Sequence, residues 1–174
     1  MNKPATVSAP PHKRASVAAA RVIPDAEGAV EIRPVRRADL DQVIDLDATV
    51  TGLAKRKYWL QIYRRYGSEQ RDGQQFLVAV AGGRVVGFVI GEVRDWEFGS
   101  PPCGWVFAID VDPHARLAGV GTALLCAISA CFRRDGVRKL RTMLARDNTV
   151  ILSFFRSQGL MAGPLIALEM DLDD

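Results

Sequence analysis

The stretch from residue 111 to residue 125 has the residue types of a phosphate-binding loop. Arg116 stands three residues before Gly119, and Gly121 follows two residues later. Glycines let a backbone turn tightly and let a ligand approach it closely. Where such a loop leads into a helix, the first backbone amides have no intrahelical acceptor and the helix dipole favours negative charge. The spacing therefore predicts a cradle for a phosphate group.

A strand and a helix must position this loop. Residues 105–111 are apolar and partly β-branched and are followed by Pro113, which is typical of a buried strand. Behind the loop, apolar residues recur at helical spacing, which predicts a helix from about Gly119 to about Arg134. Its inward residues are Val120, Leu124, Leu125, Ile128 and Cys131.

The rest of the chain alternates between strand and helix patterns. Helices are predicted after Asp39, which we expect to be an N-cap, over residues 54–66, and after Asn148. Further strands are predicted over residues 29–34, 76–81, 84–92, 137–144 and 165–172. Gly82-Gly83 predicts a hairpin turn, whereas residues 94–104 form a long loop that brings Asp95, Trp96 and Glu97 together.

Two motifs resemble those of a known family. Arg116-x-x-Gly119-x-Gly121, after a strand that ends in Val111-x-Pro113, resembles the acyl-CoA loop of the GNAT superfamily of N-acetyltransferases. Asn148, followed by Phe154-Phe155-x-x-x-Gly159-Leu160, resembles the closing motif of the same family. The predicted order of strand, two helices, three strands, helix, strand, helix and strand is also the GNAT order.

This resemblance implies a fold and a domain boundary. The fold class is mixed α/β: a mostly antiparallel twisted sheet with a splayed parallel strand pair and helices on both faces, over residues 29–174. Residues 1–28 are rich in Pro, Ala and Ser, and no acid precedes Asp25. We expect them to form a disordered N-terminal tail, with an organelle transit peptide as the alternative.

The resemblance also implies acetyl-CoA as co-substrate. The amides of residues 117–122 would bind its pyrophosphate, the strand residues Ile109 and Val111 would bond the pantetheine arm, and Asn148 would contact that arm. Asn148 suits a helix N-cap equally well. The residues assigned to acetyl-CoA are Ile109, Asp110, Val111, Arg116, Leu117, Ala118, Gly119, Val120, Gly121, Thr122, Asn148 and Phe155.

The candidate catalytic residues follow from what the reaction needs. An amine of pKa ~10.4 must lose a proton before it attacks a thioester. Many family members place a general-acid Tyr on the last helix, where this chain has Phe155, and some place a Glu early in the central strand, where it has Trp105. The remaining candidate bases, in order, are Glu92, Glu97 and Asp110, and each of them also suits an ordinary ion-paired surface carboxylate.

The resemblance implies direct transfer of an acetyl group, in a ternary complex, to a primary amine: a small molecule, a protein N-terminus or a lysine. A second hypothesis is an acyl-CoA sensor without turnover, because the family's Tyr and Glu are both missing. A dinucleotide-binding domain is disfavoured, since the third glycine of that fingerprint is absent after Gly119 and Gly121.

Composition sets the remaining expectations. The 174 residues are 48% hydrophobic and 25% charged, which is ordinary for a globular protein. A net charge of +3 gives no indication of a nucleic-acid partner, and no apolar run reaches the length of a membrane span. The three cysteines are not in CxxC spacing, which predicts reduced thiols in a cytoplasmic protein and no metal site. The oligomeric state stays open, with a homodimer as one candidate.

Overall fold

The computed structural model describes residues 21–23, 30–69, 71–115 and 119–172. Contacts divide the chain into two compact units, one that ends at Thr142 and one that begins at Met143. Each unit is described by itself below.

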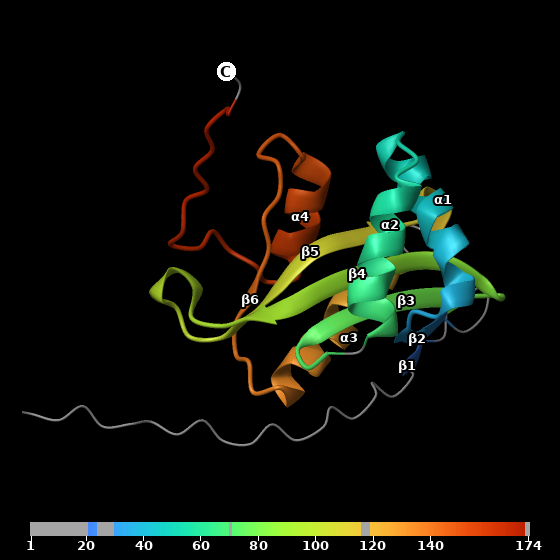
Figure 1. The fold of residues 1–174 in the computed structure, drawn as a ribbon, viewed down its shortest axis with the longest axis horizontal. Helices are drawn as coiled ribbons and strands as arrows, with labels where there is room; N and C mark the ends of the chain where they lie inside the picture. The colour runs from blue at the N-terminus through green and yellow to red at the C-terminus, as the bar shows by residue number, and fades with distance from the viewer. Residues whose placement is uncertain (1–20, 24–29, 70, 116–118, 173–174) are drawn as a thin grey trace, which may run out of the picture. The chain divides into compact units, whose positions relative to one another are not determined.

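The described part of the first unit is built on a six-stranded sheet in which the strands lie in sequence order (Figure 1). Every neighbouring pair is antiparallel except the last, which is parallel. The strands are β1 (Arg21–Ile23), β2 (Val30–Pro34), β3 (Gln74–Ala81), β4 (Arg84–Arg94), β5 (Cys103–Val111) and β6 (Leu140–Arg141). The predicted mixed sheet with one parallel pair is therefore confirmed, as is the hairpin that joins β3 to β4.

Two strands differ from the sequence prediction. β1 lies within the stretch predicted to be a tail, and it pairs with β2 through Arg21 opposite Ile32. Residues 1–20 and 24–28 of that predicted tail lie outside the described residues. β6 is shorter than the predicted strand 137–144, because the N–H of Val137 still bonds the carbonyl of Phe132 as the chain leaves the preceding helix.

Two helices cover one face of the sheet (Figure 1). These are α1 (Leu40–Thr51) and α2 (Arg56–Ile62), and α2 continues into a π-helical segment, Tyr63–Ser68. Their apolar stripes pack on the sheet residues whose side chains point to this face, as the helical spacing predicts. The resulting core is Val35, Leu40, Val43, Ile44, Leu46, Trp59, Tyr66, Phe76, Val78, Val85, Phe88 and Ile90.

The helix α3 (Val120–Arg134) covers the opposite face (Figure 1). All five residues predicted to point inward from this helix are buried. Beneath it the sheet carries Gly87, Gly91 and Gly104, and a Cβ at Gly104 would overlap the ring of Phe132. Because these positions have no side chain, α3 lies closer to β4 and β5 than a substituted sheet would allow.

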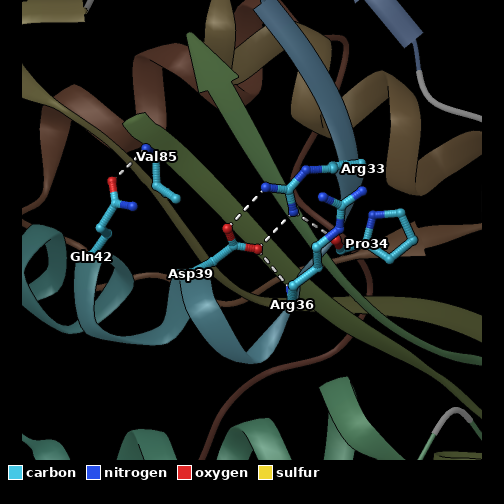
Figure 2. Close-up of polar contacts among 6 residues, drawn as sticks. All are labelled: Arg33, Pro34, Arg36, Asp39, Gln42 and Val85. Carbon is cyan, nitrogen blue, oxygen red and sulfur yellow. Dashed lines mark hydrogen bonds and ion pairs between the residues drawn. The ribbon is translucent and has the colours of Figure 1, made fainter. Parts of the chain in front are cut away.

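An ion pair joins β2 to the start of α1 (Figure 2). Arg33 donates from Nη1 and Nη2 to the two carboxylate oxygens of Asp39, at 2.6 and 2.9 Å, and the N–H of Arg36 donates to the same carboxylate at 2.7 Å. Asp39 holds the predicted N-cap position, but its side chain bonds Arg33 and Arg36 instead of the helix amides. Nearby, the N–H of Val85 donates to Gln42 Oε1 at 2.9 Å, which fastens α1 to β4.

The second unit contains α4 (Thr149–Ser157). Asn148 caps it, because Asn148 Oδ1 accepts from the N–H of Ile151 at 3.2 Å. The predicted strand over residues 165–172 is wrong: these residues form no strand, since none of them pairs with another strand among the described residues. Neither α4 nor any other helix in the described ranges has the length and apolar content needed to cross a membrane.

Substitution of Gly104 tests the close packing of α3. Gly104→Ala is expected to lower the free energy of unfolding by about 1–3 kcal/mol, because the new methyl group displaces Phe132 from a filled core. Chemical denaturation measures this. Gly163→Ala is the matched control, since nothing lies within 4 Å of a Cβ there, and its effect should stay within about 0.5 kcal/mol. Equal stability of the two variants would contradict close packing.

Asp39 gives stability a dependence on pH. Burial by itself raises the pKa of Asp39, but the bond from Arg33, the N–H of Arg36 and the neighbouring positive charges outweigh it, so the pKa lies below its usual value. A lowered pKa stabilises the fold above the unfolded-state value of about 3.9, and this contribution is lost as the pH falls through the folded-state value.

Asp39→Asn is therefore expected to cost about 3 kcal/mol at pH 7, because it leaves the Arg33 guanidinium buried without its counter-charge. The deficit should shrink as the pH falls below the unfolded-state value of about 3.9, because the unfolded wild-type chain then gains a proton more readily than the folded carboxylate does. Urea denaturation of both proteins between pH 3 and pH 7 measures it, with pH values chosen on either side of the carboxyl pKa. A deficit that is constant over this range would exclude the linkage.

Candidate active site

The N-terminus of α3 offers backbone amides to a ligand. Gly119 stands at the N-cap with φ 76°, a left-handed conformation that glycine adopts without strain. The first helical bond between described residues runs from the N–H of Ala123 to the carbonyl of Gly119, at 2.9 Å. The N–H groups of Val120, Gly121 and Thr122 therefore precede the first N–H that donates to a carbonyl of this helix among the described residues.

The surroundings of these amides suit an anion. No acidic side chain lies in the first turn of α3, and Gly119 and Thr122 are exposed. A Cβ at Gly119 would meet open space, so a ligand has room beside the helix end. These features fit a phosphate group. The predicted loop residues Arg116, Leu117 and Ala118 lie outside the described residues.

Gly87 fixes where this helix end lies. It stands opposite Val111, the last residue of β5. A Cβ at Gly87 would lie 3.0 Å from the carbonyl oxygen of Asp110, 3.1 Å from Leu124 and 3.2 Å from Val120. The first turns of α3 thus rest directly on the sheet beside the end of β5. The side chain of Val120 is buried in this contact, so only its backbone amide remains for a ligand.

The pairing register and the burial of β5 both change at Phe107. Ile90 pairs with Ala108 but Gly91 pairs with Val106, so Phe107 is an extra residue in the strand, a β-bulge. Residues 103–106 are buried, whereas Phe107 is exposed and residues 108–111 are half-buried.

The pairing of β5 with β6 also ends before the bulge. It consists of Gly104 opposite Leu140 and Trp105 opposite Arg141. Among the residues of the first unit that the structure describes, no strand pairs with this edge of β5 beyond Trp105. The pairing therefore ends at Trp105, and Ile109 and Val111 lie on the segment of β5 beyond it, while the predicted splaying of the two strands stays a prediction.

The three predicted carboxylates do not gather at one point. Glu92 lies opposite Trp105 on β5, and Asp110 lies opposite Phe88. Since Phe88, the partner of Asp110, is four residues from Glu92 on β4, the two acids are separated by about 13 Å along the sheet. The side chain of Asp110 points to the face covered by α1 and α2, the face opposite to that of Ile109 and Val111.

Glu92 is largely enclosed, with a side chain that is 14% exposed. It accepts from Tyr66 Oη at 2.8 Å and from Arg94 Nε at 3.1 Å, and Arg65 Nη2 lies 3.6 Å away. Burial, followed by the bond to Glu92 and its charge, raises the pKa of Tyr66 to about 12. The Tyr66 hydroxyl therefore stays protonated at neutral pH and continues to donate to Glu92.

This group of residues adjoins the bulge in β5. The rings of Tyr66 and Phe107 lie 5.2 Å apart, and the Arg94 guanidinium lies 4.9 Å from the centre of the Trp105 ring. Arg94 is not among the residues that the sequence pattern predicts to be functional. The spacing Glu92-x-Arg94 on a predicted strand is the signal that could have found it, because alternate residues share a face.

Glu97 is tied to the same guanidinium. Its carboxylate lies 3.7 Å from Arg94 Nη1, and its side chain is 43% exposed. It belongs to a short 3-10 turn, Glu97–Gly99, in the long loop between β4 and β5. Arg94 thus brings Glu92 and Glu97 together, as the sequence alone did not predict.

Asn148 and Phe155 belong to the second unit. Asn148 fills the N-cap role described above. Phe155 is buried, and its ring lies 5.2 Å from that of Phe154. Their assignment to acetyl-CoA stays a prediction.

Sequence comparison gives relatives with named activities. Over 101 residues the chain is 30% identical to a mycothiol acetyltransferase of Kocuria rhizophila, which is 56% of this chain and 33% of that protein. Over 79 residues it is 37% identical to an L-2,4-diaminobutyric acid acetyltransferase of Nocardia farcinica, which is 45% of this chain and 39% of that protein. The chain thus spans about a third of the length of these curated relatives.

Structural comparison gives neighbours with the same fold. An aminoglycoside N-acetyltransferase, AAC(6')-Iy, in complex with CoA matches with a TM-score of 0.72 and 20% identity, over 83% of this chain and 95% of that chain. The same enzyme with a CoA-linked bisubstrate analogue matches with a TM-score of 0.72 and 21% identity, over 82% of this chain and 97% of that chain.

The family model of the Acetyltransferase (GNAT) family matches residues 40–160. This match runs from the first residue of α1 to just beyond α4, and so includes β5 and the amide-bearing start of α3. The chain therefore belongs to the GNAT acetyltransferase family.

Proposed function

We propose that this protein transfers an acetyl group from acetyl-CoA to a primary amine, by direct attack of the amine on the thioester. The observation that supports this most is the open amide-bearing end of α3, which Gly87 places beside the end of β5, where no strand among the described residues pairs with the edge beyond Trp105. A phosphate site next to such a strand edge suits a long donor molecule that has a diphosphate at one end and amides along its arm.

The donor would lie along two elements. The amides of Val120, Gly121 and Thr122 would hold the pyrophosphate. The backbone of Ile109 and Val111 would bond the pantetheine arm along β5, with further donor contacts from Arg116, Leu117, Ala118 and Gly119.

Glu92 is our candidate for the general base. Its carboxylate is oriented by Tyr66 and Arg94, beside the bulge at Phe107 in β5. A carboxylate held in this way can take the proton of an incoming ammonium, directly or through one water. Glu97 is second because it is more exposed, and Asp110 is third because it lies far from the other two along β5.

The leaving thiolate needs no proton from the protein. As nitrogen bonds the acetyl carbon, the carbon–sulfur bond breaks and its electron pair stays on sulfur. A thiol of pKa about 8.5 is a tolerable leaving group, and the thiolate can take its proton from water. Phe155, at the position of the family's Tyr, is compatible with this route.

The relatives favour a small-molecule acceptor over a protein. The curated relatives are named for acetylation of mycothiol and L-2,4-diaminobutyric acid, and a structural neighbour for that of aminoglycosides. Each acceptor in these names is a small molecule. The three cysteines are free, which supports a reducing compartment such as the cytoplasm.

Gly119 tests the donor site. Gly119→Glu is expected to weaken CoA binding by roughly 100-fold or more, because it places a carboxylate next to the predicted pyrophosphate position. Isothermal titration calorimetry with CoA measures the change. Gly119→Asn is the matched control, since asparagine tolerates the left-handed conformation and adds no charge. Tight CoA binding by Gly119→Glu would show that this helix end is not the donor site.

Glu92 tests the chemistry. Thiol release from acetyl-CoA should require a primary amine, and Glu92→Gln should lower kcat/KM by about 100-fold to 10,000-fold. The CoA dissociation constant should stay unchanged, because Glu92 lies away from the α3 amides. Thiol detection across a panel of amino acids, aminosugars and polyamines measures the rates.

Glu97→Gln is the matched control for this test, since it also removes a carboxylate paired with Arg94. It should change kcat/KM by less than about 3-fold, as expected for a partly exposed ion pair. A greater loss in Glu97→Gln than in Glu92→Gln would transfer the role of base to Glu97. Tight CoA binding with no turnover of any amine would favour the sensor hypothesis instead.

A further inference from the structure

A row of polar side chains crosses the sheet beside the candidate base. Strand pairing places Gln74 of β3 opposite Glu92 of β4, and Glu92 opposite Trp105 of β5. Trp105 in turn lies opposite Arg141 of β6. Residues that pair across neighbouring strands share a face of the sheet, so all four side chains lie on the face of Glu92, over strands that are side by side in Figure 1.

Two buried atoms in this row have no hydrogen-bond partner among the described residues. They are Gln74 Oε1, which can only accept, and Trp105 Nε1, which can only donate. Trp105 is 7% exposed. A buried polar atom without a partner costs free energy, which a bound molecule of complementary character can recover.

Arg141 carries a positive charge that no carboxylate neutralises within the described part of the chain. It is half-buried, and its guanidinium donates to Ser100 Oγ at 3.0 Å and to Cys103 Sγ at 3.5 Å. The same guanidinium lies 6.0 Å from the centre of the Trp105 ring. None of the ion pairs between described residues includes Arg141, whereas Arg94, which also lies over the Trp105 ring, is ion-paired.

The row is therefore divided by its hydrogen-bonding character. Its β3 and β4 side has two acceptors, Gln74 Oε1 and the Glu92 carboxylate, which suit the N–H groups of an ammonium. Its β5 and β6 side has donors on Trp105 and Arg141, which suit a carboxylate. The backbones of Glu92 and Arg141 are two strands apart, or about 10 Å, which a short amino acid spans with a hydrogen bond of about 2.8 Å at each end.

We propose that the acetyl acceptor is an amine that also carries a carboxylate, an acceptor class that rests on the transfer to a primary amine proposed above. Arg141 and Trp105 Nε1 bind the carboxylate, while the amine lies at Glu92. Arg141 thus determines specificity, and Glu92 takes the proton.

The carboxylate reaches this position by replacing a weaker partner. In the free protein the Ser100 hydroxyl accepts from Arg141, and a carboxylate forms a shorter and stronger bond with a guanidinium than a neutral hydroxyl does. Ser100 follows Trp96 and Phe98, which are 71% and 73% exposed and have φ of 55° and 51°. Such left-handed conformations cost free energy in residues other than glycine, so the loop loses little when it moves away with Ser100. This movement makes Trp105 Nε1 accessible.

Matched pairs of amines test the carboxylate requirement. Putrescine and cadaverine are L-ornithine and L-lysine without the carboxylate. With the full chain and acetyl-CoA, kcat/KM should be about 10-fold to 100-fold higher for the amino acid of each pair, mostly through KM, as expected for a hydrogen bond to a charged group. Thiol detection measures the rates.

Substitution of Arg141 tests which residue reads the carboxylate. In Arg141→Gln the ratio of kcat/KM between amino acid and diamine should fall to about 3 or less, because the charged donor is lost. Arg141→Lys should keep a larger part of the ratio, since lysine retains the charge but not the planar fork of donors.

Two control variants separate recognition from a structural role. Ser100→Ala removes the present partner of Arg141 but leaves the guanidinium, so the ratio should stay within about 3-fold of the wild-type value. If Arg141 only fastened the loop, Ser100→Ala would lower the ratio as much as Arg141→Gln does. Arg138→Gln removes the same charge from a surface hollow that Arg138 lines with Arg133 and Gly136, and it should also keep the ratio.

Two outcomes with active protein would overturn the proposal. Equal kcat/KM for both members of each pair in the wild type shows that the acceptor needs no carboxylate, while acetyl transfer itself stands. A wild-type ratio in Arg141→Gln places the carboxylate elsewhere.

Calorimetric titration of L-ornithine into the protein–CoA complex decides the matter without turnover. Binding that is lost in Arg141→Gln supports the carboxylate site even if no amine is acetylated. Absence of binding to the wild type, or equal binding to both proteins, overturns it. The failure of this site and the failure of the proposed transfer are therefore distinguishable.

Discussion

The close contact between α3 and the sheet is the constraint on which the candidate site depends. Gly87 and Gly104 mark its two ends: one lies under the first turns of the helix and the other under Phe132 near its last turn. Because both positions lack a side chain, the helix axis is held close to β4 and β5 along its length. The amides of Val120, Gly121 and Thr122 are thereby fixed at the end of β5, and their orientation costs nothing when a ligand binds.

Among the described residues, β5 pairs with strands on both edges near its start and on one edge beyond Trp105. Residues 103–106 of β5 are buried between β4 and β6, and Trp105 is enclosed by the guanidinium groups of Arg94 and Arg141. Beyond the bulge at Phe107 the pairing with β6 has ended. The half of β5 that pairs on both edges holds the strand in place beside the start of α3.

Much of the fold follows from local sequence pattern, and the features that this pattern does not predict have physical causes. The spacing of Leu124 and Ile128 predicts α3, and Gly82-Gly83 predicts the hairpin, because these signals are local. The shortness of β6 depends on how the chain leaves α3 at Val137, which no local pattern encodes. The alternation in 165–172 describes what the segment would bury, but not whether a partner strand is present. For the candidate site, the spacing of the glycines predicts the loop and the helix end. The partners of Glu92 are not predicted, because they come from elements far apart in the sequence.

Arg94 links the candidate base to the loop that follows it. Its Nε bonds Glu92, its Nη1 lies near Glu97, and its guanidinium stacks on Trp105. A planar guanidinium can hold two carboxylates in fixed directions, which a lysine cannot do. Any movement of the loop around Glu97 therefore reaches Glu92 through one side chain. The loop also contains Trp96 and Phe98, both exposed and both in left-handed conformations that non-glycine residues seldom adopt. Strain of this kind persists where the surrounding structure enforces it, and it often accompanies function. An acceptor that packs on these rings would thus be coupled to the orientation of the carboxylate that takes its proton.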